Sequence, residues 1–261
     1  MYRGFQLQLD TLNLDAYKEN GQKIYDRHSR NLKPILDGYI LANGALDGAK
    51  MEAEWFPQMP ADIFISHSHD DKELAISLTG WLYDCFRIVA FIDSCIWGYA
   101  DDLLEIIDNQ YCRNDNNVNF NYTKRNRSTT HVHMMLSTAL SKMIDHSECL
   151  FFLRTPKSTI KNIVHTKTYS PWIYSEIATS QIVRKRFPDR VLTTEIMKAY
   201  SGGGVLNESQ KEELRVEYLL KLNHLVELTD RDLRAWNTRW NSLEESHTHP
   251  LDKLYHIKPV K

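Results

Sequence analysis

A short apolar strand that leads directly into a polar loop and then a helix constrains this chain most. Ile63, Phe64 and Ile65 are β-branched or aromatic and predict a buried strand. Five polar residues follow, after which apolar residues recur at helical spacing: Leu74, Leu78, Trp81 and Leu82. A strand, a loop and a helix in this order predict a βα unit of an α/β fold, in which ligands bind at the carboxyl ends of the strands.

Further apolar segments extend this pattern along the chain. Residues 88–92 (IVAFI) predict a second strand, which ends at Asp93, and residues 149–153 (CLFFL) predict a third. Residues 191–194 and 224–228 are weaker strand predictions. Helical spacing marks four longer segments: 71–86, 131–145, 170–183 and 208–222. Strands that alternate with helices predict an α/β, flavodoxin-like fold with a central parallel sheet and helices on both faces.

Polar or glycine-bearing stretches predict three loops. They are the segment 94–100, the Asn-rich insertion 113–130 and the segment 154–169. Residues 1–60 are rich in helix-forming residues and are interrupted by glycines, so we predict a helical N-terminal extension there. Residues 61–261 then form the main domain.

Composition limits the class of partner and the compartment. The net charge of −2 gives no reason to expect a nucleic-acid or membrane partner. No apolar run is long enough to span a bilayer, and the first residues lack the core of a signal peptide. The four cysteines form no CxxC pair and suit reduced thiols, so we expect a cytoplasmic protein.

The loop after the first strand allows two interpretations. His67, His69 and Asp71 have the spacing of a binuclear metal hydrolase of the metallo-β-lactamase type, in which imidazoles and a carboxylate bind zinc. Lys72 follows where such a site needs another histidine. In the alternative interpretation, Ser66 or Asp70 caps the following helix and the histidines are solvated.

A second motif lies at the start of the segment 170–183. Ser170 and Pro171 are typical of a helix N-terminus. Glu176 comes four residues after Trp172, so both side chains lie on one side of the helix. In a partly dry cleft, this carboxylate could bind a ribose hydroxyl or stabilise a cation at a sugar carbon. The alternative is a surface glutamate in a good helix.

Four segments together, ADIFISHSHDDKELA, IVAFID, CLFFL and SPWIYSE, carry a family resemblance. In this order and spacing they resemble the Toll/interleukin-1 receptor (TIR) domain, and the absence of receptor or repeat regions resembles the stand-alone bacterial type. The resemblance covers residues 61–190 and fades in the elaborated part over residues 191–261.

The resemblance implies an enzyme that cleaves the nicotinamide–ribose bond of NAD, with Glu176 as the catalytic residue. It further implies an ADP-ribose-derived signal, linear or cyclic, which acts on an effector protein in anti-phage defence of the Thoeris type. NAD would be the substrate, with no cofactor or metal, and the active state would be a homo-oligomer. The expected substrate-binding residues are Phe64, Ser66, His67, Asp93, Trp97, Ser170 and Trp172. The alternatives are a non-catalytic TIR interaction module and the metal-dependent hydrolase that uses His67, His69 and Asp71.

Overall fold

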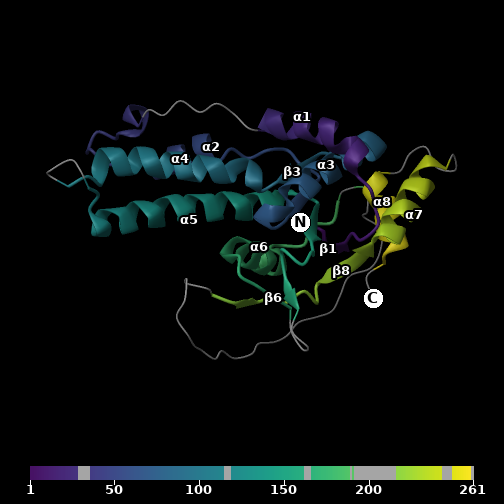
Figure 1. Ribbon diagram of the computed structural model, residues 1–261. Helices are drawn as coiled ribbons and strands as arrows, with labels where there is room; N and C mark the ends of the chain where they lie inside the picture. Colours follow the sequence, from purple (N-terminus) through teal and green to yellow (C-terminus); the bar gives the residue numbers. More distant parts are fainter. Residues whose placement is uncertain are drawn as a thin grey trace.

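The computed structural model describes residues 1–28, 36–114, 119–161, 166–188, 190, 216–242 and 249–259. Its centre is a parallel sheet of five strands in the order β3-β2-β4-β1-β8 (Figure 1). The strands are β1 (Arg3–Gln8), β2 (Ile63–Ser66), β3 (Ala90–Ile92), β4 (Cys149–Leu153) and β8 (Leu225–Thr229). Helices surround the sheet, so the predicted α/β fold with a central parallel sheet is confirmed.

Strand β1 is the main departure from the predicted N-terminal extension. The helical prediction is correct for α1 (Lys18–His28) and α2 (Gly48–Trp55), but residues 3–8 form a strand between β4 and β8. Phe5 and Leu7 are fully buried there. The strands of a flavodoxin-like sheet lie in the order 2-1-3-4-5, numbered along the chain. In this protein, the strands that correspond to numbers 1, 2, 3 and 5 are β2, β3, β4 and β8. The place of strand number 4 is taken by β1, from the N-terminal residues. The strand predicted at residues 191–194 lies outside the described residues.

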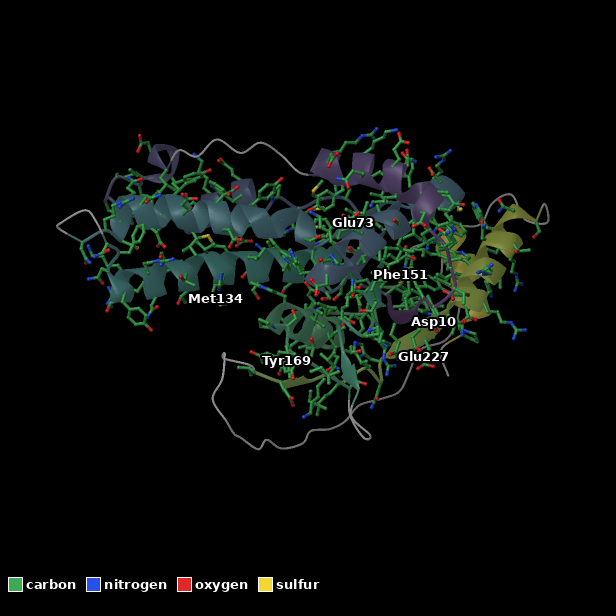
Figure 2. All side chains as sticks on the ribbon, in the orientation of Figure 1. Asp10, Glu73, Met134, Phe151, Tyr169 and Glu227 are labelled. Carbon is green, nitrogen blue, oxygen red and sulfur yellow. The ribbon has the colours of Figure 1, made fainter. Side chains whose placement is uncertain are left out.

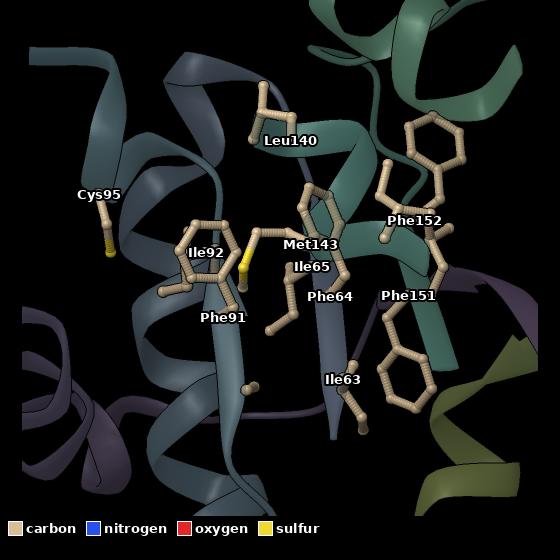
Figure 3. Packing of buried hydrophobic residues seen from close by; sticks show 14 of the residues in the cluster. Ile63, Phe64, Ile65, Phe91, Ile92, Cys95, Leu140, Met143, Phe151 and Phe152 are labelled. Atoms are coloured by element: carbon tan, nitrogen blue, oxygen red, sulfur yellow. The ribbon is translucent and has the colours of Figure 1, made fainter. Parts of the chain in front are cut away.

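Helices cover the two faces of the sheet differently. The remaining helices are α3 (Lys72–Phe86), α4 (Ser94–Tyr111), α5 (Tyr122–His146), α6 (Pro171–Ile182), α7 (Asp230–Asn241) and α8 (Pro250–Ile257). Alternate residues of a strand point to opposite faces. Phe5 stacks on Tyr255 of α8, whereas Ser66 points to the other face and bonds to α6. Figure 3 shows Phe64, on the same face as Ser66, beside Leu140 and Met143 of α5.

Helices α4 and α5 form a long antiparallel hairpin that projects from the sheet (Figure 1). The predicted loop over residues 94–100 is therefore wrong, because α4 begins at Ser94. Ile96, Ala100 and Leu103 are buried at helical spacing, a pattern that Gly98 obscures. The insertion 113–130 is likewise helical from residue 122 onwards. These residues are mostly exposed at the end of the hairpin, so they carry no apolar stripe.

A small antiparallel sheet lies beside α6 and corrects two further predictions. It consists of β5 (Ile160–Lys161), β6 (Thr166–Thr168) and β7 (Tyr218–Leu219), in that order. The predicted loop 154–169 therefore contains two short strands. The predicted helix 208–222 is wrong over residues 216–222, where β7 lies, and residues 208–215 are outside the described ranges. Tyr174 of α6 stacks on Tyr218, with ring centroids 4.7 Å apart, and this contact favours the extended strand.

Helices α1 and α3 meet where each has a glycine. A Cβ atom at Gly21 would lie 2.0 Å from the carbonyl oxygen of Ile76, and one at Gly80 would lie 2.1 Å from that of Tyr17. Real Cβ atoms never come so close to backbone, so only glycine permits this crossing. The N-terminal residues are thereby fixed to the main domain on both sides, through β1 in the sheet and α1 on α3.

Within the part of the chain that the structure describes, no helix combines the length and apolarity needed to cross a membrane. The four cysteines all lie in that part and are free thiols.

Candidate functional site

Three elements bring four polar side chains together at the carboxyl edge of the sheet. Ser66 ends β2 and His67 follows it, Asp93 follows β3, and Glu176 lies in the second turn of α6. Ser66, His67 and Asp93 are completely buried, and Glu176 is 2% exposed. We call these four residues the acidic cluster. The resemblance placed all four at one site, and the structure brings them together.

Helix α6 carries Glu176 on the face that packs against the sheet. Ser170 caps the helix by accepting a hydrogen bond from the backbone N–H of Ile173, and Pro171 begins it. The buried residues of this face are Ile173, Glu176, Ile177, Thr179 and Ser180. Glu176 thus occupies a position where packing alone would place an apolar side chain. Burial of a carboxyl group costs free energy, which is why such positions mark functional sites.

One oxygen of Glu176 has a partner and the other does not. Ser66 Oγ donates to Glu176 Oε2 at 2.6 Å, whereas Oε1 has no hydrogen-bond partner among the described residues. Burial and the neighbouring charge of Asp93 raise the pKa of Glu176 well above its ordinary value. Burial thus favours the protonated form of Glu176 in this closed state.

Asp93 is the second carboxyl group of the acidic cluster. Its Oδ1 accepts from the backbone N–H of Ser94, and its carboxyl group interacts with that of Glu176. Two ionised carboxylates can only accept hydrogen bonds, so this contact requires a proton. Burial raises the pKa of Asp93 to about 8, which keeps the pair protonated at neutral pH.

His67 is neutral and is covered by an indole ring. Burial lowers its pKa to about 4, against the opposing effect of Glu176. Its Nδ1 lies 2.7 Å from Asp93 Oδ1, but neither ring nitrogen makes a hydrogen bond of good geometry to a described residue. Trp97, in the first turn of α4, stacks on both His67 and His69, with centroid distances of 5.6 and 5.7 Å. The stacked indole helps keep His67 away from water.

A second connection at this edge ties the segment after β4 to the start of α3. Thr155 Oγ1 donates to Asp71 Oδ2, and Lys157 Nζ donates to the carbonyl oxygen of Asp70 at 2.8 Å. Lys157 also lies 3.8 Å from Asp71 Oδ1. Sequence analysis missed Thr155 and Lys157, although they follow a strand whose carboxyl end lies at the predicted site.

The other expected substrate-binding residues lie outside the acidic cluster. Phe64 is buried in the core with its ring 5.6 Å from that of Phe91. Ser170 acts as the cap of α6. Trp172 is half-buried and makes an edge contact with His133 of α5, at a centroid distance of 5.7 Å.

The residues of the metal hypothesis are engaged in other contacts. His67 and His69 stack on Trp97, and Asp71 binds Thr155. In the described ranges, no group of three or more His, Cys, Asp and Glu side chains is arranged to hold a metal ion.

The acidic cluster is sealed, whereas cavities open elsewhere on the protein. One cavity of about 410 Å³ lies between β1 and the residues after β7, and another of about 520 Å³ lies near the amino ends of β2 and β3. Neither is lined by a residue of the acidic cluster. At 2% exposure, Glu176 can be reached from solvent only after a rearrangement.

Comparison of the chain with protein-family models, with curated proteins and with solved structures gave no match.

Proposed function

We propose that this protein is a TIR-type enzyme that cleaves the nicotinamide–ribose bond of NAD, with Glu176 as the catalytic residue. The observation that carries the proposal is the pair of buried carboxyl groups, Glu176 and Asp93, at the carboxyl edge of a parallel sheet. Each has one oxygen that receives no hydrogen bond from outside the pair in the described part of the chain. Carboxyl groups with strongly shifted pKa values are typical of sites that act on glycosidic bonds.

The bond that breaks explains why a carboxyl group would be needed. The C1′–N bond electrons leave with nicotinamide, which departs as a neutral molecule and needs no general acid. The ribose becomes an oxocarbenium-like cation, which a nearby carboxylate stabilises. Attack by water gives ADP-ribose and a proton, whereas attack by a group of the same molecule gives a cyclic product.

The protonated resting state fits this chemistry. Burial raises the pKa of both Glu176 and Asp93, which favours their protonated forms. NAD would bring a positive charge on its nicotinamide ring next to them, and that charge lowers the pKa of a neighbouring carboxyl group. Glu176 would then ionise only when substrate is bound. Ser66 would hold one of its oxygens, and the other would accept a hydrogen bond from a ribose hydroxyl.

The sealed cluster is compatible with an enzyme that becomes active on assembly. A homo-oligomer in the active state, an ADP-ribose-derived signal for an effector and a role in anti-phage defence all follow from the resemblance, and they belong to the same proposal. Movement of Trp97, or release of Thr155 and Lys157 from the start of α3, would be the local step that opens the site.

A non-catalytic interaction module is the second candidate, and the sealing of the acidic cluster favours it. In that case Glu176 and Asp93 are a costly structural pair, and replacement of Glu176 would leave the protein's function intact.

Incubation of the purified full chain with NAD, with nicotinamide release followed by chromatography, tests the proposal. We expect release by the wild type and a loss of about 100-fold or more in Glu176→Gln, which retains the shape but not the charge. Glu105→Gln, at an exposed position of α4, is the matched control and should retain full activity.

Each other outcome has a definite meaning. Release that survives Glu176→Gln would place the chemistry elsewhere. If neither protein releases nicotinamide, the assay is repeated with polyethylene glycol to promote assembly and with lysate from phage-infected cells. Continued inactivity under both conditions would favour the interaction module.

A further inference from the structure

The cavity of about 410 Å³ is a separate feature that the acidic cluster does not use. It lies between β1, the residue after β4 and the segment that follows β7, and its volume is within the range of small-molecule sites. Its polar lining includes Gln6, Arg154, Thr166 and Asn223. Glu176 and Asp93 do not line it, so an inference about this cavity does not rest on the proposed function.

Arg154 presents one edge of its guanidinium group without a firm partner. Nη1 donates to Gln6 Oε1 at 2.9 Å, and the only described contact of Nη2 is a long one of 3.4 Å to Thr166 Oγ1. Nε is buried and has no hydrogen-bond partner among the described residues. The edge formed by Nε and Nη2 is one of the two that bind a pair of oxygen atoms in parallel.

Gln6 fixes the orientation of that edge. It is 7% exposed, and its Nε2 donates to the carbonyl oxygen of Leu225 at 3.4 Å, which directs its Oε1 to Arg154. The backbone N–H of Arg154 also donates to the carbonyl oxygen of Leu7. Gln6 thus anchors the guanidinium group, and Leu7 the backbone of Arg154, before any ligand arrives, which reduces the entropic cost of binding.

The surrounding charges are compatible with an anion. Lys221 also lines the cavity and adds a second positive charge. Glu227 of β8, which Figure 2 labels, lies 3.7 Å from Arg154 Nη1, an atom that is not part of the edge formed by Nε and Nη2. The Glu227 side chain is 64% exposed. Water screens an exposed carboxylate, so Glu227 neutralises Arg154 only in part.

We propose that this cavity binds the phosphate group of a phosphorylated small molecule, with the guanidinium group of Arg154 as the principal contact. A phosphate has more oxygen acceptors than a carboxylate. Thr166 and Asn223, whose side chains carry a hydroxyl and an amide group, line the cavity together with the arginine and supply further donors that a phosphate can use.

Isothermal titration calorimetry of the full chain tests the proposal, with inorganic pyrophosphate and inorganic phosphate as probes and citrate for comparison, all at constant ionic strength. We expect saturable binding of pyrophosphate or phosphate that is tighter than that of citrate. Arg154→Lys keeps the charge but loses the two-donor edge, and should weaken binding about tenfold or more. Arg184→Lys, an exposed control just beyond the end of α6, should leave binding unchanged.

Glu227→Gln provides an independent test, because its side chain is exposed and its replacement should not disturb folding. Removal of this carboxylate should strengthen anion binding. The proposal is overturned if neither phosphate probe binds saturably, if citrate binds as tightly, or if folded Arg154→Lys, checked by circular dichroism, binds like the wild type. If Arg154→Lys does not fold, unchanged affinity in Glu227→Gln overturns it instead.

Discussion

Ser66 Oγ donates a hydrogen bond of 2.6 Å to Glu176 Oε2 and so joins two residues 110 positions apart in the chain. Among the described residues, Ser66 is the only donor to this carboxyl group from outside the Glu176–Asp93 pair, and it connects the end of β2 to α6. The bond has consequences for stability as well as for the proposed chemistry.

Ser66→Ala should lower the free energy of unfolding by about 1–3 kcal/mol, because a buried carboxyl oxygen loses its donor. Urea denaturation followed by circular dichroism measures this loss. Ser175→Ala, at a half-buried position of the same helix, is the control and should cost less. Equal losses in the two variants would show that the bond to Glu176 contributes nothing specific.

Asp93 should make the protein less stable as the pH rises from about 4 to about 8. Its pKa is raised from 3.8 in the unfolded chain to about 8 in the folded protein, so between these values the folded state binds more protons. Stability then falls with increasing pH, by at most about 1.4 kcal/mol per pH unit for one proton.

Asp93→Asn removes this titration, so its free energy of unfolding should fall less steeply between pH 6.5 and 8 than that of the wild type. His67 has the opposite effect, because its lowered pKa of about 4 destabilises the fold only as the pH falls below 6.5. The comparison by urea denaturation is therefore made above pH 6.5. Parallel curves would contradict the raised pKa.

Trp97→Ala should raise the pKa of His67 from about 4 towards 6.5, because loss of the stacked indole admits water to the imidazole. Nuclear magnetic resonance titration of the histidine ring protons measures the change. Trp172→Ala removes an indole that contacts His133 instead, and should leave His67 unchanged. A pKa that stays near 4 in Trp97→Ala would show that the indole does not exclude water.

Two glycine substitutions should change stability in opposite directions. Gly80→Ala places a Cβ atom 2.1 Å from the carbonyl oxygen of Tyr17, which forces α1 and α3 apart and should cost about 1–3 kcal/mol or more. Gly98→Ala lies in α4 with no atom within 4 Å of the new Cβ, so it should stabilise by about 0.5–1 kcal/mol. Thermal unfolding of both variants tests whether the close contact of α1 with α3 at Gly21 and Gly80 stabilises the protein.

Local patterns predicted the strands β2, β3 and β4, because each is a run of apolar residues that the sheet buries on both faces. The start of α6 was predicted from Ser170 and Pro171, because a helix N-terminus favours serine as its cap and proline in its first turn whatever the helix packs against. Strand β1 could not be predicted in this way, since its place between β4 and β8 depends on pairing with residues far along the chain.

The same limit applies to the acidic cluster. The resemblance selected Ser66, Asp93 and Glu176, but no spacing in the sequence shows that the carboxyl groups of Asp93 and Glu176 meet. That contact requires β2 and β3 to be neighbours and α6 to cross the same edge. Arg154 escaped notice for a related reason, because its anchor, Gln6, lies in the strand that was not predicted.

The position of β1 also determines when the sheet can be completed during synthesis. The strand emerges from the ribosome first, yet its two neighbours are β4, which begins at Cys149, and β8, which begins at Leu225. Among the described strands, its backbone donors and acceptors have no sheet partner until β4 has been made. Pairing over such separations slows folding, so the nascent chain depends on the first residues remaining unpaired and unaggregated until the last strand arrives.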